Sequence, residues 1–179
     1  MASAASQNLS NDTRNAIIDN YNCYALGIDN KDWAMVRNCF ADEVMLDYGD
    51  LSAPGGDIDS PQSADNWVAI LQGAINGFDM TQHIISNHRF EMRGSEVVCC
   101  AYLSADHIFL AADDTAINDD TAISDDCVVR VVGEYTNVYR VVGQVAKIVR
   151  SALKVKYSTG NTNLFSLAQE RAAAQEHAG

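Results

Sequence analysis

The sequence has few prolines and no long apolar run. Both of its prolines fall in residues 49–63, which also hold three glycines and are therefore expected to form a loop. No window approaches the roughly 18 consecutive apolar residues of a membrane-spanning helix. The first residues, MASAASQNLSNDT, lack the basic cluster and apolar core of a secretory signal. We therefore expect a cytoplasmic protein.

Basic residues are scarce as well. There are 12 Lys and Arg against 24 Asp and Glu, which gives a formal net charge of -12 and a pI near 4.5. An acidic chain is repelled by the phosphate backbone of nucleic acids and by anionic membrane surfaces. We expect neither nucleic acid nor a membrane as a partner.

The sequence has no CxxC pair, and its cysteine count of five is odd. The cysteines lie in apolar stretches, where a thiol behaves as a small hydrophobic side chain. We interpret all of them as reduced. They are Cys23, Cys39, Cys99, Cys100 and Cys127.

A calcium-loop motif is also missing. Residues 111–126 (AADDTAINDDTAISDD) are rich in aspartate, but they lack glycine and the ligand spacing of an EF-hand loop. We interpret this segment as a solvated connection between strands and expect no metal site.

The composition is that of a folded protein. The chain is 47% hydrophobic and 20% charged, and 179 residues allow one domain with a substantial core. We expect that domain over residues 13–157, preceded by a disordered arm (1–12) and followed by a polar tail (158–179) with an Ala-rich end of helical character.

Helical periodicity dominates the first part of the chain and strand patterns the second. Side chains at Ser10 to Asp12 suit the start of a helix that we expect to run to about Leu26, with Gly27 marking its end. Further helices are expected at residues 31–40 and 65–71. Strands are expected at residues 44–48, 82–92, 96–110, 127–141 and 145–157, with turns at Gly94 and Gly143. This order predicts an α+β fold in which helices pack on a curved antiparallel sheet.

The expected strand over residues 96–110 carries an imidazole on its apolar face. Its odd positions from Val97 to Phe109 are apolar apart from His107, which therefore points toward the core or a pocket. A core histidine that bonds a backbone carbonyl is the ordinary interpretation of such a residue.

Other candidates are ambiguous taken alone. His83 begins a strand just after a loop, while Asp29 could simply cap the second helix. Tyr24 could be plain core and Tyr48 a rim aromatic. Spacing does not separate Arg150 from the lysines of its strand.

The runs ALGIDNKDWAMVRNCFADEVMLDYG (25–49) and TQHIISNHRFEM (81–92), followed by His107, resemble scytalone dehydratase and the wider SnoaL-like group of the nuclear transport factor 2 fold. The resemblance spans most of residues 13–157. It implies a cone-shaped domain whose catalytic residues are Asp29, Tyr48, His83 and His107.

Hexachlorocyclohexane dehydrochlorinase and bile acid 7α-dehydratase resemble the same pattern. Their Asp/His pair matches Asp29 and His83, both have an arginine near Arg150, and the bile acid enzyme has a tyrosine that matches Tyr24. We expect substrate contacts from Tyr24, Arg150, Tyr135 and Phe109. The sequence departs from scytalone dehydratase where a second catalytic tyrosine falls on Ile28 and a pocket serine on Gly133.

These observations predict a cofactor-independent lyase. Asp29 would orient the His83 ring from hydrogen-bond distance, His83 would act as acid and base, and Tyr48 and His107 would polarise a carbonyl. The expected substrate is a small, mostly apolar, cyclic molecule. An isomerase or cyclase using the same pair, or a non-catalytic binding protein, remains an alternative. The resemblance also implies a homo-oligomer, either a trimer or a dimer.

Overall fold

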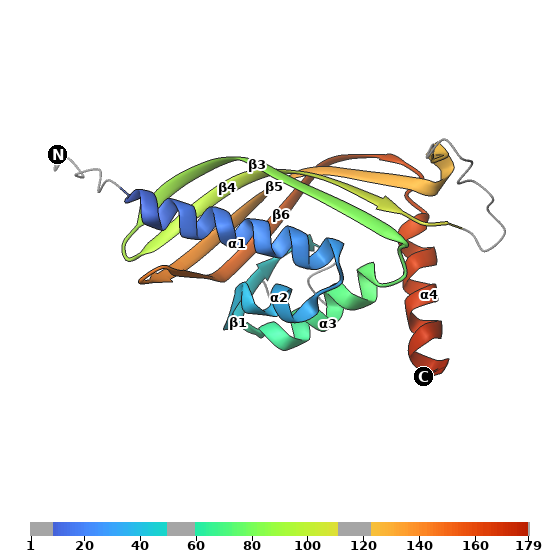
Figure 1. The fold of residues 1–179 in the computed structure, drawn as a ribbon, viewed down its shortest axis with the longest axis horizontal. Coiled ribbons are helices and arrows are strands. Elements are labelled where there is room, and N and C mark those ends of the chain that lie inside the picture. Colours follow the sequence, from blue (N-terminus) through green and yellow to red (C-terminus); the bar gives the residue numbers. More distant parts are fainter. Residues whose placement is uncertain (1–8, 50–59, 111–122, 179) are drawn as a thin grey trace.

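A curved sheet that arches over the helices dominates the structure (Figure 1). The computed structural model describes residues 9–49, 60–110 and 123–178. Within these residues lie four α-helices and a six-stranded sheet of strand order β2-β1-β6-β5-β4-β3. The predicted α+β class is confirmed.

Helix α1 (Asn11–Asp29) forms because apolar residues recur every three or four positions. Ser10 caps it by accepting a hydrogen bond from the Thr13 N–H at 3.1 Å. Its buried face packs against the sheet through Ile17, Tyr21, Tyr24 and Ile28. The helix begins at Asn11, so the expected disordered arm extended too far into the domain, and positions 1–8 of that arm lie outside the described residues.

The prediction that Gly27 ends this helix is wrong. Gly27 is a buried helical residue, and a Cβ there would come within 2.8 Å of Val36 in α2 (Trp33–Asn38). The glycine is needed for the close approach of two helices. Asp32, which accepts a hydrogen bond from the Met35 N–H at 2.9 Å, caps α2, so Asp29 has no capping role there.

The sheet is mixed, because one of its pairs is parallel. The strands are β1 (Phe40–Asp47), β2 (Gln62–Ser63), β3 (Met80–Arg93), β4 (Glu96–Ile108), β5 (Val128–Val142) and β6 (Val145–Gly160). Strands β3 to β6 follow one another antiparallel, as expected, and β1 lies parallel to β6, which adds one parallel pair to the expected antiparallel sheet. Gly94 and Gly143 have φ of +64° and +63°, which confirms the two predicted turns.

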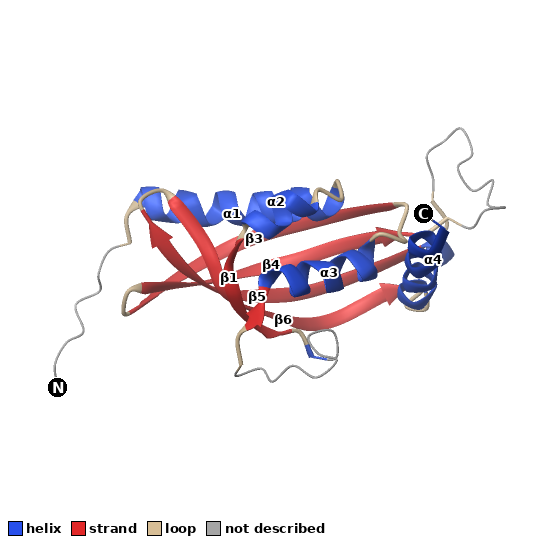
Figure 2. Cartoon of the chain, turned by 90° about the horizontal axis from the view of Figure 1, so that it is seen from below, coloured by secondary structure: helices blue, strands red, loops and turns tan. Residues whose placement is uncertain are grey.

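The core lies between the sheet and the helices. Helices α1, α2 and α3 (Ala64–Ile75) lie on the same side of the sheet (Figure 2). Trp67 of α3, Tyr21 of α1 and Tyr139 of β5 are among the largest fully buried side chains. Parts of the two expected loops, residues 50–59 and 111–122, lie outside the described residues. In the described part of the chain, no helix is long and apolar enough to cross a membrane.

The C-terminal segment belongs to the domain, which corrects the expected boundary at residue 157. Strand β6 continues to Gly160, and helix α4 (Leu164–Ala178) crosses the end of the sheet (Figure 1). Leu164 and Ala168 are buried with Phe78 and Val129. Arg171 fixes the helix further, since its guanidinium donates to the carbonyls of residues 77 and 110 and to the Asp79 carboxylate.

The contact between Gly77 and α4 gives a first prediction. A Cβ at Gly77 would lie 1.8 Å from the Ala168 carbonyl oxygen, so Gly77→Ala must displace α4. We expect a loss of about 1–3 kcal/mol in the free energy of unfolding and faster hydrogen exchange in α4. Gly73→Ala is the matched control, because that helical position is open and alanine should stabilise it by roughly 0.5–1 kcal/mol. Equal stability of the two variants would contradict this account.

Candidate active site

Asp29 and His83 meet at the end of α1, where that helix lies against β3. The Asp29 Oδ1 atom is 2.7 Å from the His83 Nδ1 atom, although 54 positions separate the residues in sequence. Asp29 Oδ2 accepts the His83 backbone N–H at 2.9 Å, and Oδ1 also accepts the Thr81 hydroxyl at 2.8 Å. The predicted hydrogen bond between the two side chains is confirmed.

These contacts fix the state of the carboxylate. Burial raises the pKa of Asp29, but the hydrogen bonds from the His83 ring, the His83 backbone and Thr81 outweigh burial and leave its pKa below the usual value. An ionised Asp29 can only accept, so His83 carries its proton on Nδ1. In the neutral ring, the Nε2 atom then carries the lone pair. The ring is well shielded, because only 6% of its side chain is exposed.

Strand register brings a second imidazole to the same place. In the β3–β4 ladder His107 pairs with Thr81 and Ala105 pairs with His83, so both histidines lie on one face. Their ring centroids are 5.4 Å apart. Burial, together with repulsion from His83, lowers the pKa of His107 to about 4, so this ring is neutral at physiological pH. Its buried Nδ1 atom has no hydrogen-bond partner among the described residues.

Both histidines line a cavity of about 360 Å³ between the sheet and the helices. Apolar side chains form most of its wall. Those from the helices are Ile28, Trp67, Ile70, Leu71, Ala74, Ile75 and Phe165, and those from the sheet include Leu103, Ala105, Val131, Leu153 and Val155. In the described part of the chain, no group of three or more His, Cys, Asp and Glu side chains is placed to hold a metal ion. The cavity therefore presents a few polar groups on an apolar surface, as ligand pockets do.

Three tyrosines supply further polar groups. Tyr24, Tyr48 and Tyr135, all named as candidates from the sequence, line the cavity. Burial raises the pKa of Tyr48 to about 12 and that of the other two well above the usual value, so all three hydroxyls stay protonated. The Tyr24 hydroxyl interacts with both of the others.

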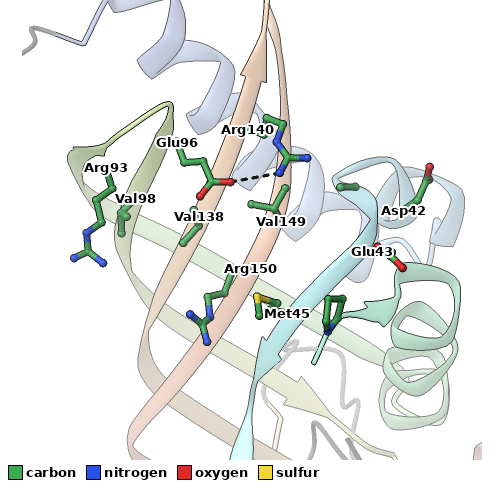
Figure 3. A pocket seen from close by; sticks show the side chains of 12 residues that line it. Asp42, Glu43, Met45, Arg93, Glu96, Val98, Val138, Arg140, Val149 and Arg150 are labelled. Carbon is green, nitrogen blue, oxygen red and sulfur yellow. Dashed lines mark hydrogen bonds and ion pairs between the residues drawn. The ribbon is translucent and has the colours of Figure 1, made fainter. Parts of the chain in front are cut away.

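Arg150 lies on the wrong face of the sheet to contact a ligand in this cavity. It pairs with Val138 and Met45, whereas its neighbour Ser151 pairs with Asn137 and faces inward. Arg150 lines a groove on the outer face (Figure 3). Side chains along β6 point alternately to the two faces of the sheet, so a shift of one residue moves a side chain to the opposite face. This alternation explains why Arg150 was expected in the cavity.

Phe109 is also outside the cavity wall. It follows the end of β4 and packs against the small cluster that holds α4, with the Arg171 guanidinium 3.5 Å from its ring centroid. Phe165 of α4 lines the cavity instead. The structure therefore does not place Phe109 at the cavity wall, where a substrate contact was expected.

Several site residues escaped sequence analysis. Trp67 lies in the predicted helix over residues 65–71, and it belongs to both the core and the cavity wall. Phe165 and Gln169 lie in the segment that was expected to be a tail. Ser151 and Asn137 are buried polar residues whose sequence signal is that the residues two positions away, on the same face of the strand, are apolar or aromatic.

Known proteins resemble this chain in sequence and in fold. The family model of the SnoaL-like domain matches residues 10–151. No curated protein gives a significant match. A solved structure from Kribbella flavida has a TM-score of 0.66 at 21% identity, covering 87% of this chain and 96% of that one.

Two solved structures with named activities are also similar. One, from Novosphingobium aromaticivorans, carries the provisional name scytalone dehydratase. Its TM-score is 0.61 at 17% identity, with 83% of this chain and 91% of that one covered. The other is the hexachlorocyclohexane dehydrochlorinase LinA-type3 of Novosphingobium barchaimii LL02, with a TM-score of 0.61 at 13% identity and coverages of 84% and 90%.

These similarities confirm the fold that the sequence predicted, and a further similar structure is described as having a cystatin-like fold. The family model covers most of the chain, including Asp29, His83 and His107. This protein belongs to the SnoaL-like domain family.

Proposed function

We propose that the protein is a cofactor-independent lyase that eliminates water from a small, mostly apolar, cyclic β-hydroxy ketone. The observation that carries this proposal is the 2.7 Å hydrogen bond between Asp29 and His83 at the wall of an apolar cavity. A binding protein gains nothing from an oriented imidazole, whereas proton transfer requires one. The provisional dehydratase and the dehydrochlorinase among the similar structures add support, because their names describe eliminations.

The proposed reaction needs one base that returns its proton. The His83 Nε2 atom takes the proton from the carbon next to the carbonyl, and the electron pair of that C–H bond forms an enolate. Collapse of the enolate forms the carbon–carbon double bond and breaks the bond to the β-hydroxyl oxygen. The departing hydroxide takes the proton back from His83, so the products are an enone and water. Asp29 stabilises the imidazolium while it exists.

The oxygen atoms of the substrate need partners in the same cavity. His107 is neutral, so it adds no second positive charge beside His83. Its ring N–H is bonded to the backbone of Val129, and its free Nδ1 atom can accept a hydrogen bond from a substrate hydroxyl. The hydroxyls of the three cavity tyrosines supply further contacts. In a cavity with mostly apolar walls such hydrogen bonds are stronger than in water.

Substitution of the pair should separate catalysis from binding. We expect His83→Ala to lower turnover by roughly 10²- to 10⁴-fold, because it removes the base, and Asp29→Asn to lower it by a similar or smaller factor. The affinity for an apolar bicyclic ketone should change little in either variant. Turnover on a panel of cyclic β-hydroxy ketones and ketone affinity are the measurements.

The matched control is His88→Ala, since His88 lies on the same strand but outside the cavity wall. It should retain activity. If wild type consumes no panel member, or if both site variants remain fully active, the lyase assignment fails. Consumption with rearrangement but no release of water would indicate an isomerase or cyclase that uses the same pair.

The state of His107 predicts an acid-sensitive stability. Its pKa is about 4 when folded and near 6.5 when unfolded, so the unfolded chain takes up a proton first as pH falls. The full contribution is present above pH 6.5, and on the order of 3 kcal/mol is lost between about pH 6.5 and pH 4. Urea unfolding across this range should show a shallower decline for His107→Phe. If the unfolding free energy of His107→Phe fell with pH as steeply as that of wild type, the assignment would be contradicted. Burial also lowers the pKa of His88, but this residue contributes equally in wild type and variant.

We also propose that the protein is a homo-oligomer, a trimer or a dimer. The three helices before β3 cover one side of the sheet, and the other side carries exposed apolar side chains such as Ile84 and Tyr102. Multi-angle light scattering at micromolar concentration should give two or three times the chain mass of 19.4 kDa. A mass equal to one chain would contradict this proposal.

A further inference from the structure

We propose that Ser151 and Asn137 are positioning residues that turn the Tyr48 proton away from the cavity, so that Tyr48 accepts a hydrogen bond from a ligand hydroxyl. This assignment deepens the proposed function and rests on it in one respect, since the hydroxyl concerned would be the leaving group. It also reverses the expectation that Tyr48 donates to the substrate carbonyl.

The direction of the bonds follows from which atoms can donate. The Ser151 hydroxyl donates to the Asn137 Oδ1 atom at 2.7 Å, and an amide oxygen can only accept. A serine hydroxyl has one proton, so Ser151 has none left for its second partner. The Tyr48 hydroxyl lies 2.7 Å from the same Ser151 oxygen. Tyr48 must therefore be the donor in that bond.

The orientation of the Asn137 amide is held from the far side. Its Nδ2 atom donates to the Tyr139 hydroxyl at 3.3 Å, which leaves Oδ1 facing Ser151. Tyr139 is hydrogen-bonded to Tyr21, and Tyr21 donates to the backbone carbonyl of Cys99 at 2.9 Å. A carbonyl oxygen cannot donate, so every proton in this chain of bonds points from the cavity toward the core.

Burial keeps this order from relaxing. Ser151, Asn137, Tyr139 and Tyr21 are each at most 2% exposed, so water cannot compete for their hydrogen bonds. Asn137 and Ser151 are direct partners in the β5–β6 ladder, and the side chains stand on the inward face. Reversing the Tyr48 proton would leave a buried group without its partner, which costs about 1–3 kcal/mol.

The arrangement divides the polar groups of the cavity into donors and acceptors. Tyr48 donates to Ser151, so it accepts in its hydrogen bond with Tyr24 and keeps one oxygen lone pair for a ligand. A ligand carbonyl can take a hydrogen bond from Tyr135 in exchange for the bond between Tyr135 and Tyr24. In the proposed elimination Tyr48 would hold the hydrogen of the β-hydroxyl group. The lone pairs of that hydroxyl oxygen then remain available for the proton that His83 returns.

Two bicyclic probes test the polarity of Tyr48 without requiring turnover. 1-Naphthol carries a hydroxyl donor, and 1-tetralone carries a carbonyl that only accepts. We expect Tyr48→Phe to weaken binding of 1-naphthol by roughly 3- to 10-fold, the loss of one hydrogen bond, and to leave 1-tetralone within twofold. Isothermal titration calorimetry measures both. Selective weakening of 1-tetralone, or equal effects on the two probes, would overturn the assignment.

Substitution of Ser151 tests the positioning role directly. In Ser151→Ala the Tyr48 proton loses its partner and can turn into the cavity, so 1-tetralone should bind more tightly and 1-naphthol more weakly. Ser151→Thr keeps the hydroxyl and should keep the wild-type preference. A Ser151→Ala protein in which both affinities move in the same direction would show a structural role alone and overturn the proposal. If this variant does not fold, Tyr48→Phe still decides.

The two proposals can fail separately. A lyase whose Tyr48→Phe variant binds 1-naphthol as wild type does would retain the Asp29–His83 chemistry and lose the assigned polarity. A protein without turnover that shows the predicted probe preference would keep the polarity and lose the reaction. Failure of wild type to bind either probe would overturn the polarity assignment.

Discussion

The hydrogen bond between Asp29 and His83 is the constraint on which the site depends, because it joins the last turn of α1 to the first residues of β3. The carboxylate accepts three hydrogen bonds from residues 81 and 83, so the helix end and the strand are fixed to each other. The same contacts keep Asp29 ionised and set the tautomer of His83. One interaction thus fixes both the position and the tautomer of the candidate base, as it must if an imidazole is to act within a mostly apolar cavity.

Much of the fold could be predicted from the spacing of apolar residues alone. Apolar residues at helical spacing marked α1, and alternation marked β4 with His107 on its inward face. This spacing could not identify Gly27 as a contact between helices. A glycine that ends a helix and a glycine that lets a second helix approach closely look alike in sequence. The spacing also could not place Arg150, since one step along β6 moves a side chain to the other face.

The candidate site could be predicted from the sequence only through the resemblance to scytalone dehydratase and the SnoaL-like group. Asp29 and His83 are far apart in the chain and ambiguous alone, and no local pattern joins them. Phe165 and Gln169 were out of reach because α4 has little apolar periodicity, and its place across the end of the sheet depends on Gly77 and Arg171. Long-range packing, which local preference does not encode, completes the cavity wall.

Similarity of fold does not determine which polar groups in the cavity donate hydrogen bonds and which accept them. The similar solved structures share the arrangement of strands and helices at 12 to 21% identity. Whether a cavity tyrosine donates or accepts is decided by the residues behind it, and here Ser151 and Asn137 meet only because β5 and β6 pair in this register. A relative with the same dyad and an apolar residue in place of Ser151 would free the hydroxyl proton of its tyrosine. It would then favour a carbonyl where this protein favours a hydroxyl, so ligand preference can diverge within the family while the fold and the base stay the same.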